Sequence, residues 1–174
     1  MIAVNLKGVW LCMRRELPQM QAQGGGAIVN TASIAGLAGL PTSSAYVAAK
    51  HGVVGLTKTA ALEYAEANIR VNAVCPGYIR TRMTEPGMQL RGEAILAQTP
   101  FKRLGNPEEI AEMVLWLCSE RASYVSGAYC KRSEPDGGAS ARPVKKCLFF
   151  YRPRCPPVVG EVEVPAPVFG FSSW

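Results

Sequence analysis

Two short apolar segments separated by one long helix constrain this chain more than any other feature. Residues 27–33 (AIVNTAS) and 69–77 (IRVNAVCPG) are mostly apolar runs of the length of a buried strand. The segment 44–67 between them predicts a helix, with Ser43 or Ser44 as its N-cap. A strand, a helix and a second strand in that order predict a parallel α/β sheet, in which ligands bind beyond the carboxyl ends of the strands.

The neighbouring segments continue this alternation of helix and strand. Apolar residues at steps of three and four predict an amphipathic helix over residues 6–23. Residues 82–105 carry scattered apolar side chains and predict a loop. The segment 106–109 (NPEE) combines an N-cap, a proline at the first helical position and a glutamate three residues after the cap, so a further helix begins there. Residues 123–129 (SYVSGAY) then lead into a third strand.

The composition argues against several classes of protein. The net charge of +6 divides equally between residues 1–129 and 130–174, so it marks no concentrated basic surface and we expect no nucleic-acid partner. No apolar run approaches the ~18 residues of a membrane span, and the N-terminus has no secretory signal pattern. We therefore expect a cytoplasmic protein with no membrane partner.

The cysteines and the single histidine predict no metal site. The six cysteines are widely spaced, with no CxxC pair, and His51 is the only histidine. The apolar surroundings of Cys12, Cys75 and Cys118 favour buried free thiols over disulfides.

The composition changes near residue 130. Seven of the 13 prolines lie in the last 45 residues, and residues 152–174 have neither helical nor clean strand periodicity. Prolines remove hydrogen-bond donors from a central strand. We therefore expect one domain over residues 1–138 and an irregular or disordered, proline-rich tail over 139–174.

Three polar residues, one at the end of the first predicted strand and two in the helix that follows, indicate proton-transfer chemistry. Ser33 ends that strand, and Tyr46 and Lys50 are four residues apart in the next helix, so the latter two share one helix face. A tyrosine hydroxyl titrates near ~10, and a nearby ammonium favours its phenolate form. Tyrosine then suits general acid/base work on a carbonyl or alcohol, and the serine hydroxyl can stabilise charge on the substrate oxygen. The Tyr-x-x-x-Lys pair alone is a common chance pattern.

The surrounding motifs make the chain resemble a known family. NTAS is followed, thirteen residues after its serine, by YVAAK, and then by GLTKTAALEYA, IRVNAVCPGYIRT and RLGNPEEIAEMVLWLCSE. In this order and spacing they resemble the short-chain dehydrogenase/reductase family, and most closely its bacterial-type alcohol dehydrogenases and ketoacyl-carrier-protein reductases. The resemblance runs from about residue 5 to residue 128. It implies the second half of a doubly wound, Rossmann-like fold and an NAD(P)-dependent oxidoreductase acting on a secondary alcohol or ketone.

The resemblance also implies roles for individual residues. Ser33, Tyr46 and Lys50 match the family's catalytic serine, tyrosine and lysine, and Lys50 and Tyr46 also contact the nicotinamide ribose. Asn5 in VNLKG lies 28 residues before the serine and matches the asparagine that holds a water of the proton path. The reading of Asn5 as a helix-capping residue remains open.

A second set of residues matches the family's nicotinamide loop. In PGYIRT, the matching positions are Pro76, Gly77, Ile79 and Thr81, with the Ile79 main chain on the carboxamide. Residues 82–105 correspond to the substrate lid, where four side chains suggest an apolar substrate flank: Met83, Met88, Leu90 and Phe101. In relatives the helices matching 6–23 and 44–67 form the subunit interface, so the resemblance implies a homo-oligomer, a dimer or tetramer.

The sequence also departs from the family's pattern. Relatives open with a strand and a Gly-rich turn that cradles the pyrophosphate, and this chain begins about where they are midway through. The adenosine half of the cofactor therefore has no evident site, and the residue that selects NAD or NADP is missing. The strand at 27–33 is left with an apolar edge that can pair with another chain. The alternative function is accordingly a truncated, non-catalytic remnant or oligomerisation module of such an enzyme.

Overall fold

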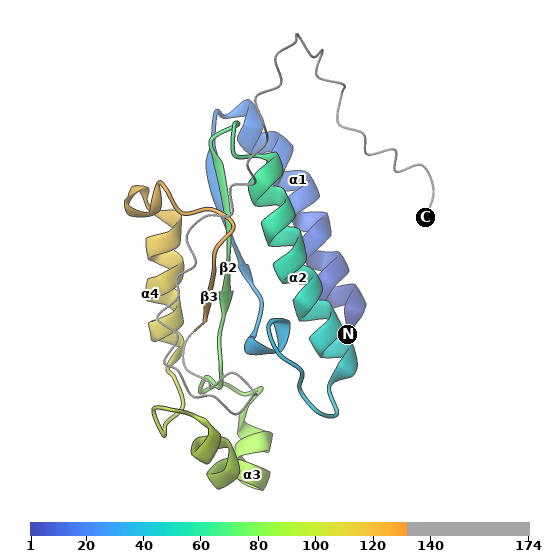
Figure 1. The fold of residues 1–174 in the computed structure, drawn as a ribbon, viewed down its shortest axis with the longest axis vertical. Helices are drawn as coiled ribbons and strands as arrows, with labels where there is room; N and C mark the ends of the chain where they lie inside the picture. The colour runs from blue at the N-terminus through green and yellow to red at the C-terminus, as the bar shows by residue number, and fades with distance from the viewer. Residues whose placement is uncertain (132–174) are drawn as a thin grey trace, which may run out of the picture.

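The computed structural model describes residues 1–131, whose fold is shown in Figure 1. In chain order the elements are a π-helical turn η1 (Ala3–Lys7), α1 (Gly8–Ala22), β1 (Gly26–Thr31), a 3₁₀ turn η2 (Ile34–Gly36), α2 (Ser44–Glu63), β2 (Ile69–Cys75), α3 (Glu85–Gln98), α4 (Pro107–Cys118), a 3₁₀ turn η3 (Glu120–Ala122) and β3 (Tyr129–Lys131). The predicted domain boundary at residue 138 and the predicted tail over 139–174 lie outside the described residues.

The three strands form one parallel sheet in the order β1-β2-β3. In its register Gly26 pairs with Ile69 and Thr31 with Val74, and Tyr129 pairs with Ala73. Helices α1 and α2 cover one face of the sheet and α4 covers the other, while α3 lies beyond the carboxyl ends of the strands, at the lower end of Figure 1. The predicted parallel α/β class is confirmed, and the segment 123–129 does lead into the third strand.

Burial from both sides explains the composition of the strands. Six of the seven residues of β2 are buried, and only Arg70 is partly exposed. Strands with helices on both faces read as continuous apolar runs because neither face meets water. The helix pair adds Met13 and Leu17 from α1, and Ala60 and Ala61 from α2, to the cluster around this sheet.

Two polar residues of β2 form hydrogen bonds to the end of α4 and to the loop that precedes β3. The Asn72 side chain is 1% exposed; its amide donates to the Val125 carbonyl at 2.8 Å and its oxygen accepts from the Ala128 N–H at 3.1 Å. The Arg70 guanidinium donates to the carbonyls of Leu117 and Ser119 at the end of α4. These bonds satisfy backbone groups that a loop and a helix terminus otherwise leave without partners.

The N-terminus of α4 forms as its local sequence predicts. Asn106 occupies the N-cap, Pro107 the first turn, and the Glu109 carboxylate accepts the Asn106 N–H at 2.9 Å. The same carboxylate makes a two-pronged pair with Arg103, at 2.7 and 2.9 Å. These interactions lie within seven residues of sequence, which is why the pattern alone identifies the start of the helix.

Several predicted boundaries are wrong by two to four residues. The first strand ends at Thr31, because the backbone turns into η2, where the Ser33 hydroxyl accepts the Ala35 N–H at 3.2 Å. The second strand ends at Cys75, before Pro76. Helix α2 ends at Glu63, and the chain reverses through a turn that contains Asn68 in the left-handed region, at φ 57. Ser43 holds the N-cap position of α2 without a capping hydrogen bond from its side chain.

The largest correction concerns residues 82–105, predicted as a loop. They contain α3, which carries a proline at its start and an acidic residue, Glu85, in its first turn. Its interior holds good helix formers such as Leu96 and Ala97. The backbone leaves the helical region at Arg91, with φ −143 and ψ 27, so α3 consists of two short helical pieces.

The cysteines differ in part from the prediction. Cys12, Cys75 and Cys118 are free thiols, as expected, but of these three only Cys75 is buried; Cys12 lies exposed on α1 and Cys118 on α4. Met13 and Leu117, which adjoin Cys12 and Cys118 in sequence, are buried, whereas the two thiols are not. Among the described residues, no helix combines the length and the apolar character that crossing a membrane requires.

Candidate active site

The predicted serine lies just beyond the carboxyl end of β1. Ser33 is buried and caps η2, and the neighbouring Ile34 N–H donates to the carbonyl of Pro76 at 3.1 Å. Pro76 follows the last residue of β2. The parallel register therefore places the Ser33 turn directly beside the start of the loop that the sequence assigns to the nicotinamide.

Lys50 occupies a fixed position between α2 and the sheet. Its side chain is 8% exposed, and its Nζ donates to the backbone carbonyl of Thr31 at 2.9 Å. The same Nζ lies 5.6 Å from the centroid of the Tyr46 ring, one helical turn earlier. A cation over an aromatic face is attracted to it, so lysine and tyrosine are held on one face of α2 as their spacing predicts.

The electrostatics of this corner follow from burial. Desolvation lowers the pKa of Lys50, and a negative charge on Cys75 would oppose that change. Burial raises the pKa of the Cys75 thiol to about 11, despite a hydrogen bond from the Ser33 backbone and the nearby charges of Lys50 and Lys58. At neutral pH Cys75 is therefore an uncharged thiol, and Lys50 meets no counter-charge from it.

The segment from Pro76 to Thr81 folds back on the chain through an isolated parallel pairing of Ile79 with Gly105. The Gly105 N–H donates to the Tyr78 carbonyl, and Gly105 accepts from the Arg80 N–H. In such a pairing the N–H and carbonyl of Ile79 itself point away from Gly105. The carbonyl accepts the Thr84 hydroxyl at 2.6 Å, and the Ile79 N–H donates no hydrogen bond within the part of the chain that the structure describes.

Thr81 and Gly77 differ in their surroundings. Thr81 is exposed; its N–H donates to the Thr84 hydroxyl at 3.1 Å, and the two hydroxyls lie 3.5 Å apart. Gly77, Tyr78 and Ile79 line one wall of a hollow whose other wall includes the following residues: Thr99, Phe101, Arg103, Gly105, Glu109 and Ile110. The predicted nicotinamide loop therefore forms part of the lining of this hollow.

Asn5 is not brought into hydrogen-bond contact with the other predicted residues. It lies in η1, and its Nδ2 donates to the Met1 carbonyl at 3.2 Å. It does not cap a helix either, because Ile2 holds the N-cap position of η1. η1 itself packs on α2 through Leu6 and Gly52, two residues after Lys50.

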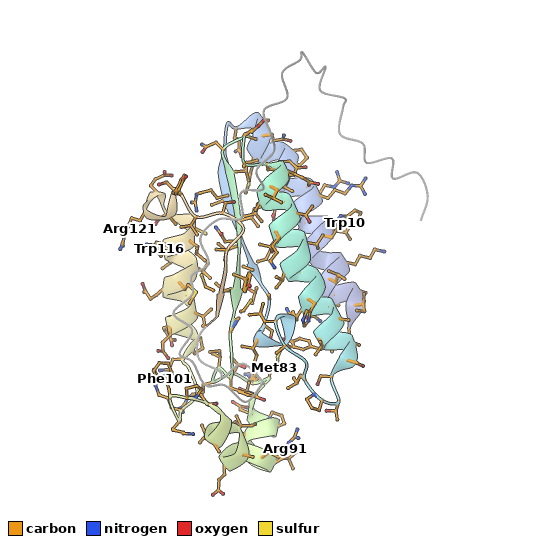
Figure 2. The ribbon with its side chains drawn as sticks, in the orientation of Figure 1. Trp10, Met83, Arg91, Phe101, Trp116 and Arg121 are labelled. Carbon is orange, nitrogen blue, oxygen red and sulfur yellow. The ribbon has the colours of Figure 1, made fainter. Side chains whose placement is uncertain are left out.

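The predicted apolar flank lies at the same end of the molecule as the strand termini. Met83 and Leu90 are 81% and 83% exposed and Phe101 is 59% exposed, whereas Met88 is half-buried. Figure 2 shows Met83, Arg91 and Phe101 together around α3, beyond the carboxyl ends of the strands. Trp10 and Trp116, by contrast, lie on the outer helices on opposite sides of the sheet.

Sequence reasoning missed three participants in this arrangement. The hydrogen bond from Lys50 to the Thr31 carbonyl depends on how α2 packs on β1. The position of Cys75 near Lys50 depends on the register between two strands. Its place directly before Pro76 was a signal in the sequence that could have identified it. Thr84, which holds the Ile79 carbonyl, lies three residues after Thr81, where a threonine commonly closes a local turn.

Fold and site together define a class of protein: an open parallel α/β protein with Ser33 just beyond the carboxyl end of β1 and with Lys50, beside Tyr46, bonded to the last residue of that strand. The family model described as "Enoyl-(Acyl carrier protein) reductase" matches residues 1–139. The chain belongs to the short-chain dehydrogenase/reductase family, a family of oxidoreductases.

Individual relatives agree with this assignment. Cyclohexanol dehydrogenase from Acinetobacter sp. (strain SE19) is 53% identical over 127 residues, which are 73% of this chain and 49% of that protein. The crystal structure of levodione reductase superposes with a TM-score of 0.72 at 42% identity, covering 76% of this chain and 54% of that one. The structure of ElxO with NADP bound gives a TM-score of 0.68 at 36% identity, covering 73% and 52%. The chain thus spans about half the length of these relatives.

Proposed function

We propose that the protein to which this chain belongs is an NAD(P)-dependent oxidoreductase that interconverts a secondary alcohol and a ketone. The observation that carries the proposal is the position of Lys50, whose Nζ lies 2.9 Å from the Thr31 carbonyl and 5.6 Å from the Tyr46 ring centroid. A lysine buried to this extent is rarely left without a functional reason, because burial of its charge costs free energy.

Tyr46 is the proposed general acid/base. In the direction of reduction its hydroxyl donates a proton to the carbonyl oxygen, and in oxidation it takes that proton from the alcohol. Ser33, in the capped turn at the end of β1, donates a hydrogen bond to the substrate oxygen as charge develops there. Lys50 keeps a positive charge beside the tyrosine and donates to the cofactor's ribose. Asn5 is proposed to hold a water that continues this proton path.

The residues present fit the nicotinamide half of the cofactor. The Ile79 N–H faces away from its Gly105 pairing and makes no hydrogen bond within residues 1–131, which supports its proposed role as a donor to the carboxamide. Pro76, Gly77 and Thr81 complete the proposed contact surface. When bound, the nicotinamide supplies or accepts the hydride. The similarity to ElxO, solved with NADP, supports a dinucleotide cofactor, and the choice between NAD and NADP stays open.

The substrate class follows from the α3 region, residues 82–105. Its exposed Met83, Leu90 and Phe101 favour an apolar substrate body beside the polar reaction centre. The names of two relatives, cyclohexanol dehydrogenase and levodione reductase, fit a ring-shaped alcohol or ketone of that kind.

We further propose a cytoplasmic homo-oligomer that uses the α1–α2 face, without a nucleic-acid or membrane partner. Exposed apolar side chains on this side support the proposal: Val4 on η1, Leu11 on α1 and Leu62 on α2. Light scattering behind size-exclusion chromatography tests it, because Leu11→Glu with Leu62→Glu should convert the oligomer to a monomer.

A cofactor titration tests the proposed function. We expect NADH or NADPH to change the intrinsic fluorescence and raise the melting temperature of the full chain. The alternative function, a non-catalytic remnant or oligomerisation module, predicts no change at millimolar concentrations of either cofactor. Lys50→Met serves as the control variant, because it removes the ribose donor and should abolish the response.

A further inference from the structure

The turn that carries Ser33 approaches the backbone of α2 unusually closely at Gly36. Gly36 is the last residue of η2 and is buried. A Cβ built on it would lie 2.7 Å from the Lys50 carbonyl oxygen, 3.0 Å from the Lys50 carbonyl carbon and 3.2 Å from Val54 Cγ2. The first of these distances is about 0.7 Å short of the 3.4 Å at which ordinary contact begins. Since two of the three obstacles are backbone atoms, rotating a side chain does not relieve the contact.

The helix that Gly36 touches is tied to the sheet at two further points. Lys50 donates to the Thr31 carbonyl at 2.9 Å. Seven residues later on α2, Thr57 accepts the buried Asn30 amide at 2.9 Å and donates to the Val53 carbonyl at 2.8 Å. A side chain added at position 36 therefore meets a helix that is fixed to β1, and the turn is the part that yields.

A displaced turn takes Ser33 with it. Gly36 N–H donates to the Ser33 carbonyl at 2.8 Å, so the two residues move as one unit. The Ile34 N–H, which donates to the Pro76 carbonyl at 3.1 Å, connects the same unit to the nicotinamide loop. The contact between Gly36 and the Lys50 backbone therefore determines how far Ser33 lies from the Tyr46–Lys50 pair.

We propose that Gly36 is a positioning residue, which sets the spacing between the Ser33 hydroxyl and the Tyr46–Lys50 pair by letting η2 lie against the backbone of α2. This inference rests on the proposed function, and it concerns the same site. Any side chain at position 36 moves Ser33 away from the substrate oxygen while leaving the cofactor contacts of Lys50 in place.

The test compares Gly36→Ala with Gly39→Ala in the full chain. Gly39 lies three residues further along the same connection, and a Cβ built there meets nothing within 4 Å. We expect Gly36→Ala to speed hydrogen exchange of the Ile34 amide about tenfold in NMR spectra, with the amides of α2 unchanged. We expect kcat for cyclohexanol oxidation to fall about 100-fold at an unchanged KM for the cofactor, because small misplacements of reacting groups cost that much. Gly39→Ala should match the wild type in both measurements.

Other outcomes overturn the proposal. A folded Gly36→Ala variant with wild-type exchange at Ile34 and wild-type kcat contradicts it, as does an equal effect of Gly39→Ala. Should Gly36→Ala fail to fold, the wild-type chain decides, because the proposed contact requires nuclear Overhauser effects between the Gly36 Hα protons and the Val54 methyl groups. A wild-type chain without oxidoreductase activity contradicts the proposed function, and the exchange measurement still decides the role of Gly36.

Discussion

The two sides of the proposed site are built very differently. The strand-end region, made of Ser33, Lys50, Cys75 and the carboxyl ends of β1 and β2, is buried and held by bonds between distant parts of the chain. The α3 region, residues 82–105, is mostly exposed, and its side-chain hydrogen bonds include ones that join residues close in sequence, such as Thr84 with Ile79 and Lys102 with Ala97.

This difference has a functional meaning. The proposed proton transfer requires groups held at fixed positions, and the residues proposed for it lie on elements whose packing also stabilises the fold. Substrate recognition tolerates variation, and an exposed segment can change its side chains at little cost to stability. The predictions below test whether the two regions separate in this way.

The largest effect on stability is expected for Asn72→Ala, in the middle of β2. The change leaves the Val125 carbonyl and the Ala128 N–H without the partners that Asn72 provides. Each unsatisfied buried group costs about 1–3 kcal/mol, so the free energy of unfolding should fall by about 3 kcal/mol in urea titrations. Leu90→Ala in α3 is the matched control, with an expected change within about 0.5 kcal/mol. Equal losses in the two variants would remove the distinction between the regions.

A pH-dependent effect is expected at Cys75. Because its thiol pKa is raised from 9.0 to about 11, the folded chain holds this proton more tightly than the unfolded chain. That contribution to stability is complete below the unfolded value and is lost as the pH rises through the folded one. Between about pH 8 and about pH 10.5 the wild type should lose about 2 kcal/mol more than Cys75→Ala.

The exposed Cys118 provides the control for this measurement. Cys118→Ala should show the full alkaline loss of the wild type in the same urea titrations. A Cys75→Ala variant that loses as much stability as the wild type would show that the Cys75 thiol is not buried in the strand-end region.

A smaller loss is expected for Arg70→Ala. Its guanidinium donates to the carbonyls of Leu117 and Ser119 at the end of α4, and it is only partly buried. Hydrogen bonds from a charged group contribute about 1.5–3 kcal/mol when buried, so partial exposure reduces the expected loss to about 1 kcal/mol. Faster hydrogen exchange should be confined to the last turn of α4. Unchanged hydrogen exchange in the last turn of α4 would show that Arg70 does not cap this helix.

The smallest stability effect, with a distinct functional one, is expected for Phe101→Ala. Phe101 is 59% exposed, so the free energy of unfolding should change by less than about 0.5 kcal/mol. Its proposed contact with an apolar substrate predicts a KM for cyclohexanol raised about tenfold at an unchanged kcat. A fall in kcat with constant KM would place Phe101 with the reacting groups instead of the substrate flank.

The sequence predicts the parts of this fold whose causes are local. The start of α4 is one case, because Asn106, Pro107 and Glu109 act on one another. The existence of β1 and β2 is another, because burial on both faces leaves continuous apolar runs. The pairing of Tyr46 with Lys50 follows in the same way from one helical turn.

The rest depends on tertiary contacts or on weak local signals. Helix α3 was missed because its apolar residues are at most half-buried, and Leu90 is exposed, so they leave no buried stripe. The end of β1 was misplaced because the Ser33 hydroxyl accepts the Ala35 N–H and bends the chain. The burial of Lys50 against the Thr31 carbonyl depends on how α2 packs on the sheet, which no short motif encodes.

The measurement that tests the account most directly is the turnover of Tyr46→Phe, which removes one oxygen and keeps the ring beneath the Lys50 ammonium. With cyclohexanol and the cofactor that binds in the titration, we expect kcat to fall by ~10³-fold relative to the wild type, because general acid/base catalysis contributes on that scale. A Tyr46→Phe variant that turns over at the wild-type rate would contradict the assignment of the proton transfer to this tyrosine.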